Sequence, residues 1–344
     1  MADPNDRRIT INDVARQAGV SYQTVSRVIN GHPYVARTTR ARVLQAITEL
    51  GYQPNKAAKS LASSRSHTLG LIVFGMAFYG PTQMVINIER AARAAGYDLI
   101  FSNLADATVE AMEASISALS GWRVEGILAI TPVLCEASAQ VSTLCATTPY
   151  VQIDINQGSP TPSVIVDQAY GSRLITQHLI DLGHTQICEI SGPMDWFGAM
   201  ARHESWLHTL ADAGLTPGPS LEGDWSAQSG YQTARQLLDR GIPFTALVAG
   251  NDQMALGAIR ALRERGLRIP RDVSIVGFDD IPEAIYFDPP LTTIKQDFDA
   301  LGKKGIEYLM DRVGHPDAPP EQRVIYPRLV ERESTAPPLH AAPR

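Results

Sequence analysis

The chain has 344 residues, of which 44% are hydrophobic and 19% charged, and its net charge is -6. This length allows two or three domains with a buried core, and the composition excludes a disordered chain. The charge is unevenly divided, because residues 1–66 contain ten Lys or Arg against four Asp or Glu, a net of +6, which leaves -12 for the remainder. A cationic module on an acidic body is typical of a nucleic-acid-binding segment joined to another domain.

The cysteines indicate a reducing compartment. Cys135, Cys145 and Cys188 are far apart and have none of the spacings of zinc ligands or of a redox pair. Scattered cysteines favour reduced thiols in a cytoplasm. The first residues contain no apolar core of a secretory signal, and no apolar run is long enough to span a membrane. We therefore expect a cytoplasmic protein with no metal, no cofactor and no membrane partner.

The first predicted elements are two short amphipathic helices. Residues 11–18 repeat apolar side chains with a helical period, and Thr10 and Asp13 have the spacing of a capping box. Gly19 then permits a sharp turn into a second helix over residues 21–30. Two short helices joined in this way form a helix-turn-helix, whose second helix enters the major groove of DNA. An ordinary helical hairpin with a polar exterior gives the same pattern.

The second helix lacks the Glu and Lys that usually cover a solvated face. Its polar residues, including its cap, are Ser21, Tyr22, Gln23, Thr24, Ser26, Arg27 and Asn30. An arginine can bridge O6 and N7 of guanine, a carboxamide can bridge N6 and N7 of adenine, and hydroxyl groups add further contacts. We therefore predict that these residues contact base edges.

A third helix is predicted over residues 38–50, and Gly51 ends it. Three arginines near its start could reach phosphates and position the module: Arg37, Arg40 and Arg42. Residues 55–62 form one further helical piece, which is too short to be stable alone in water, so we expect it to fold only against a partner. Leu61 in this piece is either a wedge for the minor groove or a minor core contact, and the spacing alone leaves both open.

From Thr68 the sequence alternates between strands and helices. Buried-type strands are predicted at 69–74, 98–102, 126–131, 150–154, 164–167, 187–191, 246–249 and 273–278. Helices are predicted at 84–95, 171–182, 200–213, 232–240, 254–265 and 300–313. Repeated units of this kind predict parallel sheets with helices on both faces, and about 260 residues of them predict two doubly wound lobes.

Polar residues gather where the predicted strands end. Asp154 ends one strand, Asn251 and Asp252 follow a second, and Asp279 and Asp280 follow a third. Ligands bind at the carboxyl ends of parallel strands, where acceptors of this kind suit vicinal hydroxyls. A guanidinium donor and stacking rings are supplied by Arg202, Trp225 and Phe298. Taken singly, Asn251 and Asp252 could simply cap the next helix, but the cluster favours a small polyol.

Six stretches together resemble the lac repressor family of bacterial transcription regulators. They are INDVARQAGVSYQTVSRVIN at 11–30, LGYQPN at 50–55, GDWS at 223–226, NDQMALGA at 251–258, GFDD at 277–280 and PLTTIKQDF at 290–298. The resemblance covers about Ile9 to Arg332. It implies a homodimer with an all-α helix-turn-helix module, a hinge helix, and an α/β core of two parallel-sheet lobes like a periplasmic sugar-binding protein.

The resemblance also implies the domain boundaries. The helix-turn-helix domain is expected at 9–54, the hinge helix and linker at 55–66, the effector-binding core at 67–335 and a flexible tail at 336–344. The core is discontinuous, because the chain crosses between the lobes three times. The first lobe is expected to contain residues 67–161 and 292–323, and the second residues 162–291 and 324–335.

Functional residues carried over from the family fall in both parts of the chain. Those that match DNA contacts are Tyr22, Gln23, Arg27, Asn55, Ala58 and Leu61. The match favours the minor-groove wedge for Leu61. Those that match effector contacts are Phe78, Asp154, Arg202, Trp225, Asn251, Asp279, Gln296 and Phe298. The resemblance therefore implies double-stranded operator DNA and a galactoside-like sugar as partners.

Two departures from the family pattern affect these expectations. Phe74 and Ile130 stand where the family resemblance implies small polar or amide side chains, so we expect one wall of the pocket to be apolar. The tail after Glu333 has no leucine heptads that would build a helical bundle, which favours a dimer over a tetramer.

The predicted function is repression of transcription by occupancy of an operator. A dimer places two recognition helices in successive major grooves about 34 Å apart. Binding of a sugar then shifts the lobes and separates the hinge segments, which is an order-to-disorder switch. The alternatives are a corepressor mechanism, in which the ligand tightens DNA binding, and a response to a different sugar.

Two other classes of protein fit less well. An enzyme is not expected, because the chain has no GxxxxGK[ST] loop, no GxSxG elbow and no HExxH pair, and adjacent carboxylates such as Asp279 and Asp280 usually point apart. A secreted sugar-binding protein would need a signal peptide and would have no use for the cationic module.

Overall fold

The computed structural model describes residues 9–29, 31–53, 66–134, 136–145 and 147–339. The chain divides into two compact units, Met1–Ser66 and His67–Arg344. This division coincides with the predicted boundary between the linker and the core. The predicted hinge residues 55–65 lie outside the described residues.

The first unit contains the three predicted helices, α1 (Ile11–Ala18), α2 (Tyr22–Ile29) and α3 (Arg37–Leu50). The capping box at the start of α1 is present, since the Thr10 backbone N–H donates to Asp13 Oδ2 at 2.9 Å. Gly19 adopts a φ of 63°, the left-handed conformation that ends α1. The helices enclose one small core, made by Val14, Ala15, Ala18, Val25, Val28, Val43 and Ala46.

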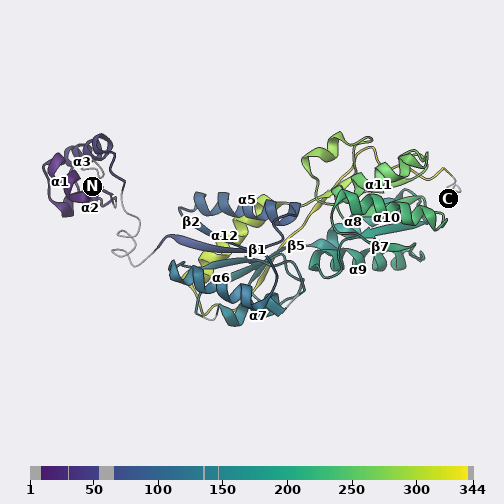
Figure 1. Ribbon diagram of the computed structural model, residues 1–344, viewed down its shortest axis with the longest axis horizontal. Helices are drawn as coiled ribbons and strands as arrows, with labels where there is room; N and C mark the ends of the chain where they lie inside the picture. The colour runs from purple at the N-terminus through teal and green to yellow at the C-terminus, as the bar shows by residue number, and fades with distance from the viewer. Residues whose placement is uncertain (1–8, 30, 54–65, 135, 146, 340–344) are drawn as a thin grey trace, which may run out of the picture. The chain divides into compact units, whose positions relative to one another are not determined.

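The first lobe of the second unit is built on a parallel sheet in the order β11-β5-β4-β3-β1-β2. Its strands are β1 (Thr68–Phe74), β2 (Asp98–Leu104), β3 (Ile127–Ile130), β4 (Tyr150–Ile153), β5 (Ser163–Val166) and β11 (Gln322–Ile325). Its helices are α5 (Tyr79–Ala94), α6 (Val109–Gly121), α7 (Glu136–Leu144) and α12 (Phe298–Gly314). Helices α5 and α12 share one apolar cluster with the sheet, and α6 and α7 share another on the opposite face (Figure 1).

The second lobe has a parallel sheet in the order β7-β6-β8-β9. Its strands are β6 (Ile187–Ser191), β7 (Ser220–Glu222), β8 (Ala246–Ala249) and β9 (Ser274–Val276). Its helices are α8 (Gln168–Asp181), α9 (Phe197–Asp212), α10 (Ala227–Asp239), α11 (Asp252–Glu264) and the 3-10 helix η1 (Pro282–Tyr286). Helices α10 and α11 cover one face and α8 and α9 the other, so both lobes are doubly wound, as the alternating pattern predicted.

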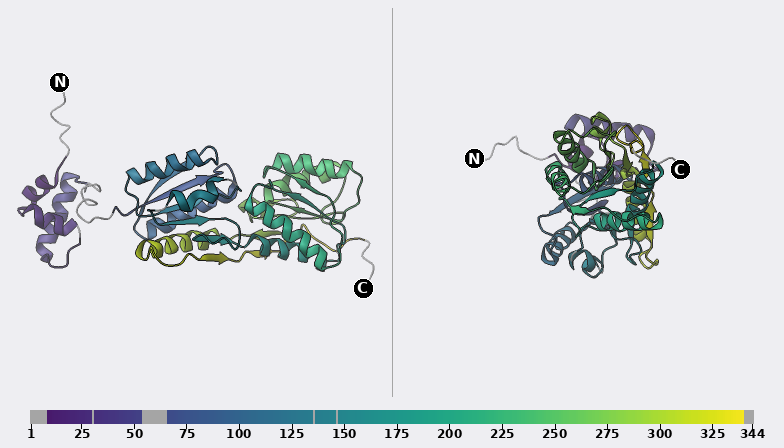
Figure 2. Two further views of the ribbon diagram at one scale, coloured as in Figure 1. Left: turned by 90° about the horizontal axis from the view of Figure 1, so that it is seen from below. Right: turned by 90° about the vertical axis from the view of Figure 1, so that its right-hand side faces the viewer.

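The chain crosses between the lobes three times, but the crossing points differ from the prediction. β5 was expected to open the second lobe, yet it pairs with β4 and β11 in the first-lobe sheet. β10 (Thr293–Lys295) was expected in the first lobe, yet it pairs with β12 (Arg328–Val330), and Ile294 packs in the second-lobe core. The crossings therefore follow β5, β10 and β11, and the last of them is the yellow segment that joins the lobes in Figure 2. A short apolar strand suits either sheet, which is why its composition did not identify its partner.

The expected flexible tail begins later than residue 336. Ala336 donates its N–H to Ser274 Oγ at 3.0 Å, and its carbonyl oxygen lies 2.9 Å from Nε2 of the buried His184. Ser334 is also buried and bonds to the backbone of Ile275. The second lobe therefore includes this segment, because the buried polar groups of His184 and Ser274 need partners.

Candidate functional site

Helix α2 presents the predicted base-reading side chains to solvent. Tyr22 is 53% exposed, and Gln23 and Arg27 are exposed as well. Val25 and Val28 lie on the opposite face and are buried in the core of the first unit. The separation into a buried face and a polar face is as predicted, and contact of the polar face with DNA stays a prediction.

The hydroxyl groups at the start of α2 also serve the helix itself. The Thr24 N–H donates to Ser21 Oγ at 3.2 Å, and the two hydroxyl oxygens are 2.9 Å apart, so Ser21 caps the helix. Ser26 is partly buried. Four predicted DNA contacts lie outside the described residues, namely Asn30, Asn55, Ala58 and Leu61.

The second unit contains a cavity of about 460 Å³, part of it open to solvent, with walls from both lobes. Seven predicted ligand-binding residues line it: Phe78, Asp154, Arg202, Trp225, Asn251, Asp279 and Gln296. The predicted eighth residue, Phe298, is not part of the lining. It begins α12 and packs in the first-lobe core, where its ring meets the lining residue Tyr79 edge-on.

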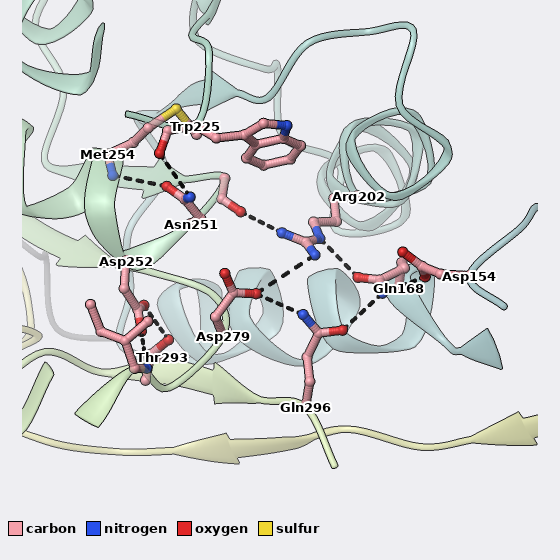
Figure 3. Close-up of polar contacts among 12 residues, drawn as sticks. Asp154, Gln168, Arg202, Trp225, Asn251, Asp252, Met254, Asp279, Thr293 and Gln296 are labelled. Carbon is pink, nitrogen blue, oxygen red and sulfur yellow. Dashed lines mark hydrogen bonds and ion pairs between the residues drawn. The ribbon is translucent and has the colours of Figure 1, made fainter. Parts of the chain in front are cut away.

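A continuous hydrogen-bond network crosses the cavity (Figure 3). The Arg202 Nε donates to Gln168 Oε1 at 2.9 Å, and its Nη1 donates to the Gly250 carbonyl oxygen at 2.6 Å. Gln168 Nε2 donates to Gln296 Oε1 at 2.9 Å, and Gln296 Nε2 donates to Asp279 Oδ1 at 2.6 Å. Residues that are far apart in the sequence are thereby joined into one polar wall.

Burial strongly perturbs the charged groups of this wall. Burial raises the pKa of Asp279 to about 6, and it also raises the pKa of Asp154. The Arg202 guanidinium opposes both shifts, while burial lowers its own pKa. Its Nη2 lies 3.9 Å from Asp279 Oδ1, and its guanidinium stacks 3.7 Å from the centre of the Phe278 ring. Perturbed groups that converge on a cavity are typical of a functional site.

Asn251 and Asp252 have different roles. Asn251 caps α11, since its Oδ1 accepts from the Met254 N–H at 2.8 Å, and its Nδ2 donates to the Trp225 carbonyl oxygen at 3.0 Å. It therefore lines the cavity and fixes the position of Trp225. Asp252 is fully buried and accepts from Thr293 Oγ1 at 2.5 Å and from the Ile281 N–H at 2.8 Å. Burial raises its pKa well above the usual value, and its place is structural.

Sequence reasoning missed several lining residues. The most informative of them is Trp196, which stands in the loop before α9. Gln168 is not part of the lining but was missed as well, and it joins the lining residues Arg202 and Gln296 through hydrogen bonds. Gln168 follows β5 and could have been found by the strand-end rule that identified Asp154. Others come from the start of α5 and carry no polar signal, namely Tyr79, Gly80, Pro81 and Met84.

The expected apolar wall exists, but other residues build it. Ile130 is fully buried in the first-lobe core, and Phe74 is part of the cluster on the opposite face of that sheet. Neither belongs to the cavity lining, although Phe74 contacts the lining residue Trp196. The start of α5 supplies the apolar side chains instead, because the first turn of that helix covers the cavity.

Three lining residues have left-handed backbone conformations, which side chains other than glycine rarely adopt. Their φ values are 60° for Asp154, 72° for Trp225 and 113° for Asp279. Each such residue costs on the order of 1–3 kcal/mol and persists where the surrounding structure enforces it. The strain therefore coincides with the cavity, as is common for ligand sites.

The sequence model described as bacterial regulatory proteins, lacI family, matches residues 10–55, and a periplasmic binding protein-like domain matches residues 176–335. The lactose operon repressor of Escherichia coli K12 is 38% identical over 96% of this chain and 91% of its own. The ribose operon repressor of that strain is 35% identical over 94% of this chain and 99% of its own. This chain belongs to the lacI family.

As a member of the lacI family, the chain is a DNA-binding transcriptional repressor, and its relatives are repressors and not enzymes. A structure of the lac repressor dimer bound to operator and the anti-inducer ONPF matches with a TM-score of 0.89 at 38% identity, covering 96% of this chain and 100% of that one. The predicted fold class, a helix-turn-helix module with a periplasmic-binding-protein-like core, is thereby confirmed.

Among the residues that the structure describes, no helix is long and apolar enough to cross a membrane. In the same residues, no group of three or more His, Cys, Asp or Glu side chains is arranged to hold a metal ion.

Proposed function

We propose that this repressor is a homodimer that binds double-stranded operator DNA and is released by a small sugar, a galactoside, bound in the cavity. The observation that carries the proposal is the polar network between the lobes. Asp154 follows β4 of the first lobe, Arg202 belongs to α9 of the second, and Gln296 lies on a crossing segment. A ligand held by these groups contacts both lobes at once, so its binding energy favours one arrangement of the lobes over others.

The chemistry of the lining supports a sugar. Asp154 and Asp279 offer carboxylate acceptors for vicinal hydroxyls, and Arg202 offers a guanidinium donor. The indole of Trp225 supplies a flat ring, and its Nε1 is buried with no hydrogen-bond partner among the described residues. A buried donor of this kind is satisfied when a ligand supplies an acceptor. The similarity to the lactose operon repressor favours a galactoside. Because the chain is also similar to the ribose operon repressor, other sugars are the alternative to test.

A second copy of the chain is the proposed partner of an apolar surface on the second lobe. Leu256 on α11 is 44% exposed, and Ile285 and Tyr286 on η1 are 52% and 85% exposed. A groove lined by Leu256 and Tyr231 runs between α10 and α11. Large apolar side chains gathered in this way are typical of an interface, and the matched lac repressor structure is a dimer.

In the DNA complex, Tyr22, Gln23 and Arg27 read the major groove, and residues 55–66 form the hinge. Leu61 is the proposed wedge in the minor groove, with Ala58 and Asn55 beside it. Effector binding separates the two hinge segments and removes the wedge. A coupling free energy of about 1–3 kcal/mol already changes operator affinity roughly 5- to 150-fold, so a modest rearrangement suffices.

The test is operator binding by fluorescence anisotropy at one fixed salt concentration. Wild-type protein is titrated with a symmetric lac-like operator, alone and with methyl β-D-galactoside, lactose or ribose. Release by a galactoside supports the proposal. Tightening by the sugar would replace it with a corepressor mechanism, and release by ribose alone would replace the galactoside.

Two arginine variants separate base reading from phosphate contact. Arg27→Ala should cost about 1–3 kcal/mol on the cognate operator and relax specificity at the base pair that Arg27 contacts. Arg42→Ala, the matched control on α3, should weaken binding to all sequences about equally and reduce the salt dependence. Equal behaviour of the two variants would contradict a base-reading role for Arg27.

A further inference from the structure

Trp196 gives the cavity an aromatic end. Its ring is edge-on to Phe78 of the first lobe, with centroids 4.9 Å apart, and edge-on to Trp225 of the second lobe at 5.8 Å. The Phe74 ring lies 6.4 Å away. Trp196, Phe78 and Trp225 all line the cavity. We call these four residues the aromatic cluster, which joins the two lobes at one side of the site.

The position of Trp196 is fixed by the backbone around it. Residues 195–197 pair with residues 132–134 of the first lobe. The Leu134 N–H donates to the Asp195 carbonyl oxygen at 2.6 Å, and the Phe197 N–H donates to the Pro132 carbonyl oxygen at 2.9 Å. Gly75 leaves room for the indole, because a Cβ there would lie 2.9 Å from Trp196 Cη2. The backbone pairing and the neighbouring rings therefore hold the Trp196 side chain against the cavity.

The neighbouring wall is also poor in hydrogen-bonding side chains. It consists of the first residues of α5 and the residue before them, Phe78, Tyr79, Gly80, Pro81 and Met84, and we call it the α5 wall. Its polar side-chain group is the hydroxyl of Tyr79, whose pKa is raised by burial to about 12, so it stays protonated. The acceptors and the guanidinium of the site stand elsewhere, on Asp154, Arg202 and Asp279.

This division predicts what can lie beside the sugar ring. A second sugar carries several hydroxyls, and each one that loses water without gaining a partner against the α5 wall costs binding energy. A flat apolar group loses no hydrogen bonds there, and it gains edge or face contacts with Trp196 and Phe78. We propose that Trp196 determines specificity, and that it selects a glycoside with an aromatic aglycone over a disaccharide. This inference rests on the proposed sugar effector.

The test compares matched ligands by isothermal titration calorimetry on the full-length protein. Phenyl β-D-galactoside should bind about tenfold more tightly than methyl β-D-galactoside, equivalent to about 1.4 kcal/mol, and lactose should bind no better than the methyl glycoside. In Trp196→Ala, the preference for phenyl over methyl should fall to about twofold or less. Trp196→Phe keeps an aromatic edge and should retain part of the preference.

Trp122→Ala is the matched control. It makes the same chemical change at a tryptophan that is 68% exposed at the end of α6 and does not belong to the lining. It should leave the preference unchanged. If methyl galactoside binds and releases operator but phenyl shows no preference, the inference fails and the proposed function stands. If no galactoside binds, but phenyl glucoside binds better than methyl glucoside and this preference depends on Trp196, the inference stands and the galactoside is rejected as the effector. Absence of binding by every glycoside tested, alkyl, aryl or disaccharide, overturns both.

Discussion

Replacing Arg202 with methionine should show how much its positive charge stabilises the buried carboxylates of the cavity. The substitution keeps an apolar stem against Phe278 but removes donors to Gln168 Oε1 and to the Gly250 carbonyl, and it removes the positive charge near Asp279. Breaking a buried ion pair from one side costs about 3–5 kcal/mol, since the partner charge remains uncompensated. We expect the free energy of unfolding of the core to fall by about this amount at pH 7.5.

The size of the loss should depend on pH. In the folded chain the pKa of Asp279 is raised to about 6 from 3.8, so the folded state binds a proton that the unfolded state has already lost. The stability that this carboxyl contributes therefore falls as pH rises between these two values. Without Arg202, the pKa of Asp279 and of Asp154 rises further, because the guanidinium opposes both shifts. Lowering the pH from 7.5 to 5.5 should then restore part of the variant's stability.

Urea unfolding followed by circular dichroism at both pH values measures this difference. The gap between wild type and Arg202→Met should be smaller at pH 5.5 than at pH 7.5. The double variant Arg202→Met with Asp279→Asn should be more stable at pH 7.5 than the single variant, because it removes one uncompensated charge. An equal gap at both pH values, with no gain in the double variant, would refute the electrostatic explanation and assign the loss to packing.

Three further predictions concern other parts of the chain. A Cβ at Gly192 would lie 2.1 Å from Trp225 Cη2, so Gly192→Ala should displace that ring and weaken sugar binding about tenfold by calorimetry, whereas Gly121→Ala, which meets no atom within 4 Å, should not. The His203 Nδ1 lies 2.5 Å from Glu189 Oε2, and this contact raises the pKa of His203. The contact stabilises the folded state fully below the unfolded pKa of 6.5, and this stabilisation is lost as pH rises through the raised folded pKa. The loss of unfolding free energy in His203→Gln, measured with urea, should therefore shrink between pH 6 and pH 9. A constant loss would count against the ion pair. Thr10→Ala removes the capping box of α1 and should destabilise the first unit by about 1 kcal/mol, seen as a lower midpoint of its thermal transition, and an unchanged midpoint would mean that the box contributes nothing.

The helices of the first unit could be predicted because their periodicity is local. Val25 and Val28 recur at helical spacing, and the residues between them are polar, so the sequence alone separates the buried face from the exposed one. In the core, the rule that ligands bind at the carboxyl ends of parallel strands also predicted site residues. It placed Asp154, Asn251 and Asp279 in one cavity, because parallel strands of a lobe end at the same edge of the sheet.

Other features depend on tertiary partners that no local pattern specifies. β5 has three apolar residues after Ser163 that suit either lobe, and its pairing with β11, more than 150 residues away, decides its place. Trp196 and the α5 wall carry no polar signal and come from a loop and a helix start. Phe298 stands two residues from the lining residue Gln296, yet its side chain is buried in the first-lobe core. Neighbours in sequence can thus serve different environments.

The polar network suggests that the polar and the aromatic parts of the cavity contribute differently to ligand binding. Arg202, Gln168, Gln296 and Asp279 form hydrogen bonds with one another. A sugar must therefore exchange its hydrogen bonds with water for bonds to a network that is partly closed, and such exchanges contribute little net free energy. Burial of apolar surface requires no such exchange of hydrogen bonds. The hydroxyl contacts should accordingly determine which sugar fits and how it is oriented, while the aromatic cluster around Trp196 should supply most of the affinity.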